Sequence, residues 1–140
     1  MSRGRQKGAP DGGPVQESPR ALGDWGEDLA ACFLQGMGYE IVSRNQRLGP
    51  VEIDLLVRCG ETLAIVEVRL RSGTARGRPE ETVSPRKRRT LLRAWRQIAA
   101  SHPEARVVRM DILAIELDGR RRLSLRHYPH AWIPPGLSPF

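Results

Sequence analysis

The sequence of 140 residues predicts an α/β fold in which a mixed sheet packs against helices. Two segments show the roughly 3.6-residue apolar period of an amphipathic helix, and between and after them lie segments in which apolar residues alternate with a period of two. The predicted order is helix, three strands, helix, two strands, which is typical of helices packed on a sheet. At this length we expect one domain with its own hydrophobic core.

The first helix is expected within residues 22–38. Its apolar stripe would consist of Leu22, Trp25, Leu29, Phe33 and Met37. Asp24, followed three positions later by Glu27, fits a capping box at the helix start, and Gly38 fits the residue after its end. Glu27 therefore has an ordinary structural explanation.

The next segments predict three strands, over residues 39–45, 51–58 and 61–71. Cys59 and Gly60 are the expected two-residue turn between the second and third strands. With that turn, the numbers of directly paired residues sum to 119, which sets the register of the hairpin.

This register places acidic side chains together on one face of the hairpin. Glu52 would lie opposite Glu67, with Asp54 and Arg69 on the same side. Opposed like charges destabilise a strand pair, so a bound divalent cation would explain them. Mg²⁺ prefers oxygen ligands and polarises phosphodiesters. The alternative is a row of exposed polar side chains in which Arg69 forms a salt bridge with Glu67.

The second helix is expected over residues 84–101, because Ser followed by Pro is typical of a helix start. Residues 106–117 predict a strongly apolar strand, and an Asp-Gly pair at 118–119 predicts a hairpin to a last strand over residues 121–128. Within the apolar strand, Asp111 is expected either to bond a neighbouring loop amide or to support a residue of the site from behind, and the structural role is favoured.

The two ends of the chain lack the pattern of core elements. Residues 1–20 are rich in Gly, Pro and charge, which predicts a disordered basic arm before a domain at 21–132, and residues 133–140 predict a flexible tail. No segment resembles a secretory signal or approaches the roughly 20 apolar residues that cross a bilayer. The two cysteines, Cys32 and Cys59, predict neither a disulfide framework nor a zinc site and fit a reducing cytoplasm.

Basic residues are concentrated in one part of the chain. The formal net charge is +7; ten basic residues and two acids lie between Arg69 and Arg96, so this segment carries +8 and the rest −1. Such a segment predicts a surface that follows a phosphate backbone. Anionic membranes, an acidic partner, or a merely solvated helix face are the alternatives.

Several stretches, in this order, resemble a known family. They are "GDWGEDLAACFLQGMGYEIVSRNQR", "VEIDLL", "LAIVEVRLR", "RMDILAIE" and "LRHYPHAW". Over residues 20–132 the chain is similar to the bacterial YraN-like proteins, an uncharacterised family similar to PD-(D/E)xK nucleases and Holliday junction resolvases. The resemblance implies a restriction-endonuclease-like αβββαβ core with a mixed central sheet flanked by helices.

The resemblance also implies roles for individual residues. Asp54 matches the metal-binding aspartate, Glu67 the (D/E) of the motif, and Glu27 an additional acid from the first helix, with Mg²⁺ or Mn²⁺ as the metal. Two positions depart from the family: Val51 replaces a glycine, and Arg69 replaces the motif lysine. Because arginine stays protonated, Arg69 can stabilise charge on a phosphate but cannot act as a base.

Three functions are compatible with these features. The first is a metal-dependent nuclease-like protein that acts on DNA or another nucleic acid, with Asp54, Glu67 and Arg69 as its catalytic residues. The second is a nuclease-fold binding module that has lost cleavage, and the third is a protein-interaction domain with a basic helix. The expected nucleic-acid contacts are Arg71, Arg76, Arg78, Lys87, Arg89 and Arg93. The likeness to resolvases makes a homodimer a further expectation.

Overall fold

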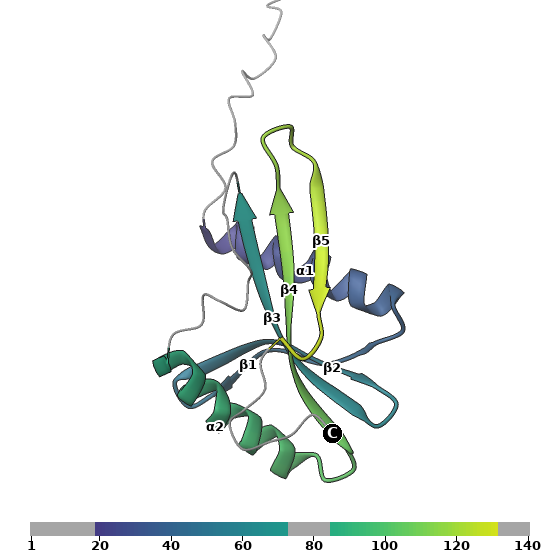
Figure 1. The fold of residues 1–140 in the computed structure, drawn as a ribbon, viewed down its shortest axis with the longest axis vertical. Helices are drawn as coiled ribbons and strands as arrows, with labels where there is room; N and C mark the ends of the chain where they lie inside the picture. Colours follow the sequence, from purple (N-terminus) through teal and green to yellow (C-terminus); the bar gives the residue numbers. More distant parts are fainter. Residues whose placement is uncertain (1–18, 73–84, 132–140) are drawn as a thin grey trace, which may run out of the picture.

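The computed structural model describes residues 19–72 and 85–131, which form a five-stranded mixed sheet with one helix on each face (Figure 1). The elements are α1 Pro19–Gly36, β1 Glu40–Leu48, β2 Val51–Cys59, β3 Thr62–Ser72, α2 Pro85–Ser101, β4 Val107–Leu117 and β5 Leu123–Tyr128. The predicted α/β class and order are confirmed, and the arrangement is that of a restriction-endonuclease-like core. The predicted arm before residue 19, the predicted tail, and the segment that contains Arg76 and Arg78 lie outside the described residues.

The strands are ordered β1-β2-β3-β4-β5 across the sheet. Neighbouring strands are antiparallel except β3 and β4, which are parallel and connected through α2. Parallel neighbours require such a crossover, whereas the antiparallel pairs are joined by short turns. In Figure 1, α1 crosses behind the upright strands β3, β4 and β5, and α2 lies near the lower end of the sheet.

Alternation along β3 divides the hydrophobic core into two layers. Ala64 and Val66 pack on the α1 side, whereas Leu63 and Ile65 pack on the α2 side. Even-numbered positions of β3 therefore face α1 and odd-numbered positions face α2, because successive side chains of a strand point to opposite faces. Glu67 continues the odd series and belongs to the α2 side.

The start of α1 differs from the prediction. The helix begins at Pro19, well before the expected cap Asp24, and proline suits the first helical position because its φ is already restricted to a helical value. The capping-box explanation of Glu27 is therefore wrong, since this residue lies inside the helix. The end of the helix is as expected: Gly38 follows Gly36 closely and has a φ of 96°, which favours glycine.

The buried stripe of α1 is rotated relative to the predicted one. Ala30 and Leu34 are fully buried and Ala31 nearly so, whereas Trp25 and Met37 are 43% and 51% exposed. The two adjacent alanines leave room for the helix to approach the sheet closely. The periodic pattern of large apolar residues therefore does not mark the buried face of this helix, which these small residues form.

The turn between β2 and β3 lies one residue later than predicted. Cys59 is not in the turn but pairs with Thr62, so Gly60 and Glu61 are the turn residues. Gly60 has a φ of 59° and Glu61 is not among the described residues with positive φ. A positive φ at the first central residue alone is the pattern of a type II′ turn, which favours glycine there.

This turn corrects the register of the acidic residues. The ladder ends with Leu55 opposite Val66, so one further step brings Asp54 level with Glu67, and the predicted opposition of Glu52 and Glu67 is wrong. The error is two residues, and side chains alternate with a period of two. The prediction that Asp54 and Glu67 share a face therefore survives the shift.

The second half of the chain follows the prediction with one correction. The second helix, Pro85–Ser101, has the expected bounds within one residue. In the last hairpin Leu117 pairs with Leu123, which leaves a longer turn than the expected Asp-Gly pair. The Asp118 carboxylate accepts hydrogen bonds from backbone N–H groups in this turn, including that of Arg122. Within residues 19–72 and 85–131, neither helix combines the length and the apolar character of a membrane span.

Candidate functional site

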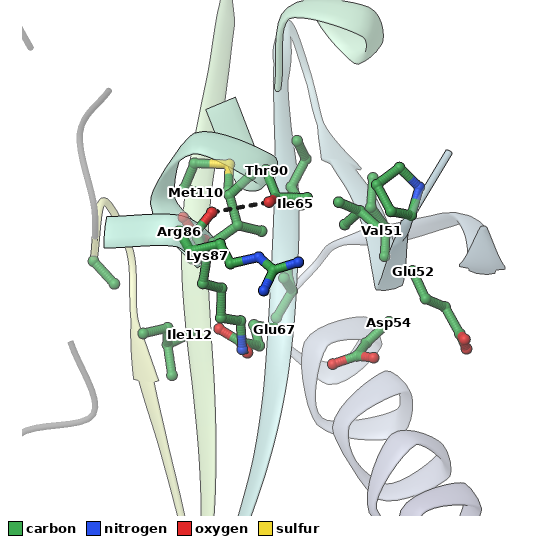
Figure 2. A pocket seen from close by; sticks show the side chains of 16 residues that line it. Val51, Glu52, Asp54, Ile65, Glu67, Arg86, Lys87, Thr90, Met110 and Ile112 are labelled. Carbon is green, nitrogen blue, oxygen red and sulfur yellow. Dashed lines mark hydrogen bonds and ion pairs between the residues drawn. The ribbon is translucent and has the colours of Figure 1, made fainter. Parts of the chain in front are cut away.

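A cavity of about 470 Å³ lies on the α2 side of the sheet, between the start of α2 and strands β2, β3 and β4 (Figure 2). Its apolar lining residues are Pro50, Val51, Ile53, Ile65, Val66, Leu91, Met110 and Ile112, with Ala131 at its edge. Its charged lining residues come from three strands and from α2: Glu52, Asp54, Glu67, Asp111, Arg86 and Lys87. This volume is within the range of ~300–1,000 Å³ that is typical of small-molecule sites.

Asp54 lies where β2 separates from β3. Its Oδ2 accepts a hydrogen bond of 2.8 Å from the backbone N–H of Val68, just beyond the last backbone pair of the ladder. The pKa of Asp54 is raised from 3.8 to about 6, and burial is the main cause. The hydrogen bond from Val68 acts in the opposite direction and lowers this pKa. The negative charges of Glu27, Glu67 and Glu52 raise this pKa further. The site therefore favours a bound proton or cation.

The Glu67 carboxylate is held between two cations. Arg69 Nη2 lies 3.1 Å from Glu67 Oε2, and Lys87 Nζ forms an ion pair with Oε1. Figure 2 shows the Lys87 side chain reaching from the first turn of α2 toward Glu67. The side chain of Lys87 is 47% exposed and that of Arg69 12%, so Lys87 is the cation more open to a ligand. The sequence predicts Lys87 as a nucleic-acid contact, and no sequence pattern indicates its contact with Glu67.

Glu27 stands apart from this cavity. It lies on α1, is not among the cavity-lining residues, and its carboxylate accepts a hydrogen bond from the Asn45 side chain. Burial raises the pKa of Glu27, whereas Asn45 and the nearby charge of Arg44 lower it. Its Oε2 is buried and has no hydrogen-bond partner among the described residues. Glu27 thus acts on Asp54 through its charge, without lining the cavity itself.

The structure therefore assembles only part of the predicted metal site. Asp54 and Glu67 border the same cavity, with Glu52 at its outer edge, while Glu27 does not join them. Among residues 19–72 and 85–131, no three or more Asp, Glu, His or Cys side chains are grouped as in a metal centre. At most two protein carboxylates are placed to serve one ion in this arrangement.

One face of α2 carries a row of arginines. Arg86, Arg89, Arg93 and Arg96 fall within a sector of about 80° and span about 15 Å along the axis. The helix contains no acidic residue, and none of the four forms an ion pair in the described part of the chain. A second hollow of about 450 Å³, lined by Pro50, Arg86, Arg89, Thr90 and Arg93, adjoins the cavity.

Arg86 and Arg96 belong to the basic segment counted in the sequence, although neither was among the predicted nucleic-acid contacts. Arg71, another predicted contact, lies on β3 opposite Glu116 of β4 and does not line the cavity or the second hollow. Of the predicted nucleic-acid contacts that the structure describes, Lys87, Arg89 and Arg93 therefore lie together on α2, and Arg71 lies apart from them.

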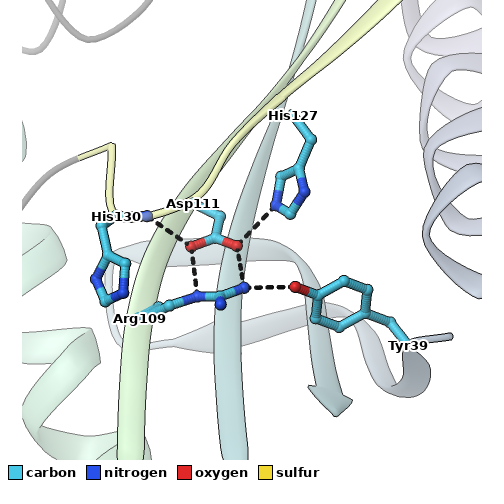
Figure 3. A network of polar contacts seen from close by, with 5 residues as sticks. All are labelled: Tyr39, Arg109, Asp111, His127 and His130. Atoms are coloured by element: carbon cyan, nitrogen blue, oxygen red, sulfur yellow. Dashed lines mark hydrogen bonds and ion pairs between the residues drawn. The ribbon is translucent and has the colours of Figure 1, made fainter. Parts of the chain in front are cut away.

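A second polar cluster, on β4 and β5, has a structural role (Figure 3). Asp111 accepts hydrogen bonds from both Arg109 and His127, and from the backbone N–H of His130 at 3.1 Å. Arg109 also donates to the hydroxyl of Tyr39 at 2.7 Å. Burial acts to raise the pKa of Asp111, but the hydrogen bonds of His127 and Arg109 outweigh it and hold this pKa below 3.8. The prediction that Asp111 bonds a loop amide is confirmed.

Comparison with known proteins identifies the family. The model of the uncharacterised protein family UPF0102 matches residues 26–115. The chain belongs to the UPF0102 family. It is 42% identical over 115 residues to the UPF0102 protein of Anaeromyxobacter dehalogenans, an alignment that covers 81% of this chain and 84% of the relative. It is 40% identical over 108 residues to the UPF0102 protein of Frankia casuarinae, with 76% and 92% covered.

Membership of UPF0102 confirms the YraN-like resemblance. The matched region runs from the middle of α1 to β4 and includes Asp54, Glu67 and Lys87. The names of these UPF0102 relatives state no activity. The function has to be inferred from the chemistry of the cavity and of the arginine face.

Proposed function

We propose that this UPF0102 protein is a metal-dependent nuclease that hydrolyses phosphodiester bonds of nucleic acid. The observation that carries the proposal is the placement of Asp54 and Glu67 at one cavity beside an acid-free helix with a row of arginines. Carboxylates that bind a hard cation and arginines that bind phosphates are the two components such a reaction requires.

The two carboxylates fit Mg²⁺ or Mn²⁺. Mg²⁺ usually binds one or two protein carboxylates and completes its coordination with water and substrate phosphate oxygens, so Asp54 and Glu67 suffice. The raised pKa of Asp54 also fits, because the ionised carboxylate lies among like charges that a cation would offset. When bound, the ion supplies Lewis-acid polarisation of the phosphodiester.

The remaining charged residues have distinct tasks in this proposal. Arg69 is largely buried and holds Glu67 in place through its contact with Oε2. Lys87 is half exposed at the cavity rim, where its ammonium group can orient water and neutralise the charge that develops on the phosphate. The arginine face of α2 binds the phosphates on either side of the scissile bond.

A binding module without cleavage is the second candidate. Two cations already neutralise Glu67, and the motif position holds Arg69 in place of lysine. A site of this kind would bind a phosphate backbone in a salt-sensitive manner without turnover.

The test is cleavage of labelled single-stranded, duplex, flapped and four-way-junction DNA and of RNA, with Mg²⁺ or Mn²⁺. Asp54→Asn is the informative variant, because asparagine retains an acceptor for the Val68 N–H but removes the charge. Glu61→Gln, at an exposed position that does not line the cavity, is the matched control. We expect metal-dependent cutting by the native and control proteins and none by Asp54→Asn. Binding without cutting by the native protein would support the second candidate instead.

A further inference from the structure

The cavity is larger and more apolar than a metal ion and a phosphate require. Its floor is formed by Ile65, Met110 and Ile112, and the carboxylate of Asp111, which also lines the cavity, is already bound by Arg109 and His127. A phosphate and its ion need polar surroundings, so they do not complement the apolar floor. A second part of the ligand, flat and weakly polar, would complement it. A nucleobase attached to that phosphate has this character.

The arginine-lined hollow adjoins the cavity directly. Pro50, Arg86 and Thr90 line both, so one ligand can extend from one into the other. The hollow offers guanidinium groups, which bind phosphate, and the cavity offers apolar side chains. Together they complement a nucleotide that is part of a longer strand, with its base in the cavity and neighbouring phosphates along α2.

We propose that the cavity takes one unstacked nucleotide, so that the substrates are strands with an unpaired nucleotide at the cleavage point: single strands, flaps or frayed ends. This inference rests on the proposed function. The bases of a continuous duplex are stacked and cannot enter a cavity beneath a helix without leaving the stack. That step costs a few kcal/mol for a paired base and least for one that is already unpaired.

The floor also limits what can be read from the base. Ile65, Met110 and Ile112 offer no side-chain hydrogen-bond groups, and the Thr90 hydroxyl already donates to the carbonyl oxygen of Arg86 at 2.9 Å. No aromatic residue is among the residues that line the cavity within the described ranges. The apolar floor therefore offers no side-chain hydrogen bonds with which to distinguish one base from another.

Binding of two DNA duplexes tests this inference, one blunt and one with a single unpaired nucleotide that carries 2-aminopurine. Ca²⁺ replaces Mg²⁺ so that the substrate is not cut. We expect the overhang to bind at least about tenfold more tightly than the blunt duplex, equivalent to about 1.4 kcal/mol, with a change in 2-aminopurine fluorescence. All four bases at the overhang should bind within about threefold of one another.

Ala131→Leu fills the edge of the cavity without altering a charge, and its backbone hydrogen bond to the Met110 carbonyl oxygen is retained. It should abolish the preference for the overhang and leave blunt-duplex binding intact, whereas Ala131→Ser should behave as the native protein. Val51→Phe, at the opposite wall, should repeat the effect of Ala131→Leu. Equal binding of both duplexes with unchanged fluorescence would overturn this inference and leave the nuclease proposal standing. Failure to bind any oligonucleotide would overturn both.

Discussion

Replacing Asp54 with asparagine should make the metal-free protein more stable, and increasingly so as the pH rises. Burial and the charges of Glu27 and Glu67 raise the pKa of Asp54 from 3.8 to about 6, which means that the ionised form is unfavourable in the folded state. Asparagine has nearly the same shape, carries no charge, and can still accept the hydrogen bond of the Val68 N–H. The substitution would thus remove a destabilising charge that the proposed function requires.

The sign and size of the effect follow from proton linkage. The pKa of this carboxyl group is higher in the folded chain than in the unfolded chain. Below the pKa of the unfolded chain the group does not affect stability, and stability is lost as the pH rises from there through the pKa of the folded chain. Between 3.8 and about 6, at about 1.4 kcal/mol for each pKa unit, full ionisation of Asp54 costs about 3 kcal/mol. At pH 5 the unfolding free energy has already fallen by about half of this amount, so it falls by about a further 1.4 kcal/mol between pH 5 and pH 8. Because Asp54 is partly exposed to solvent, which screens its charge, these free energies are upper values.

Urea unfolding of the native protein and of Asp54→Asn, in EDTA at pH 5 and pH 8, measures the effect. We expect the difference in unfolding free energy between the two proteins to grow by about 1 kcal/mol from the lower to the higher pH. Ile53→Val, a neighbouring buried and uncharged change, should cost about 1 kcal/mol at both pH values. A difference for Asp54→Asn that stays constant, or that shrinks with rising pH, would refute the electrostatic account of this residue.

Three further predictions concern other parts of the molecule. Arg89→Gln should weaken duplex binding and reduce the slope of log K against log salt by about 0.9. Arg106→Gln, in the connection before β4, should change neither the affinity nor the slope. Equal losses of affinity in the two variants would contradict the arginine face as the contact surface. Lys87→Met should lower metal-dependent cleavage by about 10²–10⁴-fold in single-turnover assays, and full activity of this variant would exclude Lys87 from the chemistry. Asp111→Asn should lower the unfolding free energy at pH 7 by about 3–5 kcal/mol, because it leaves the Arg109 charge without its partner; a loss below about 1 kcal/mol would show that the cluster contributes little.

Local periodicity was sufficient to predict most elements. The bounds of α2 follow from a proline at its start and from its apolar stripe, and β3 follows from an apolar run after a turn that continues into alternating residues. Even the mistaken turn at Cys59 left Asp54 and Glu67 on one face, because an error of two residues does not change the parity of a strand. Faces of a sheet are thus more predictable from sequence than the exact partner of each residue.

Features that depend on packing between distant segments were not predictable. The buried face of α1 depends on how closely the helix approaches the sheet. Ala30 and Ala31 permit a close approach, but they do so only through contacts with strands that are distant in the sequence. The contact of Lys87 with Glu67 joins positions 20 residues apart, and the cluster around Asp111 includes Tyr39, which precedes β1, and His127 of β5. No periodic pattern records such contacts.

The pairing of Glu67 with two cations bears on why the motif lysine can be replaced. Arg69 reaches one carboxylate oxygen from the same strand, and Lys87 reaches the other from α2. A guanidinium group stays protonated and suits a permanent structural charge, whereas an ammonium group can exchange a proton with water. In the proposed site the requirement is an ammonium group beside Glu67, not a lysine at one position of the chain, and Lys87 meets it. Arg69→Lys should therefore change cleavage less than Lys87→Met does.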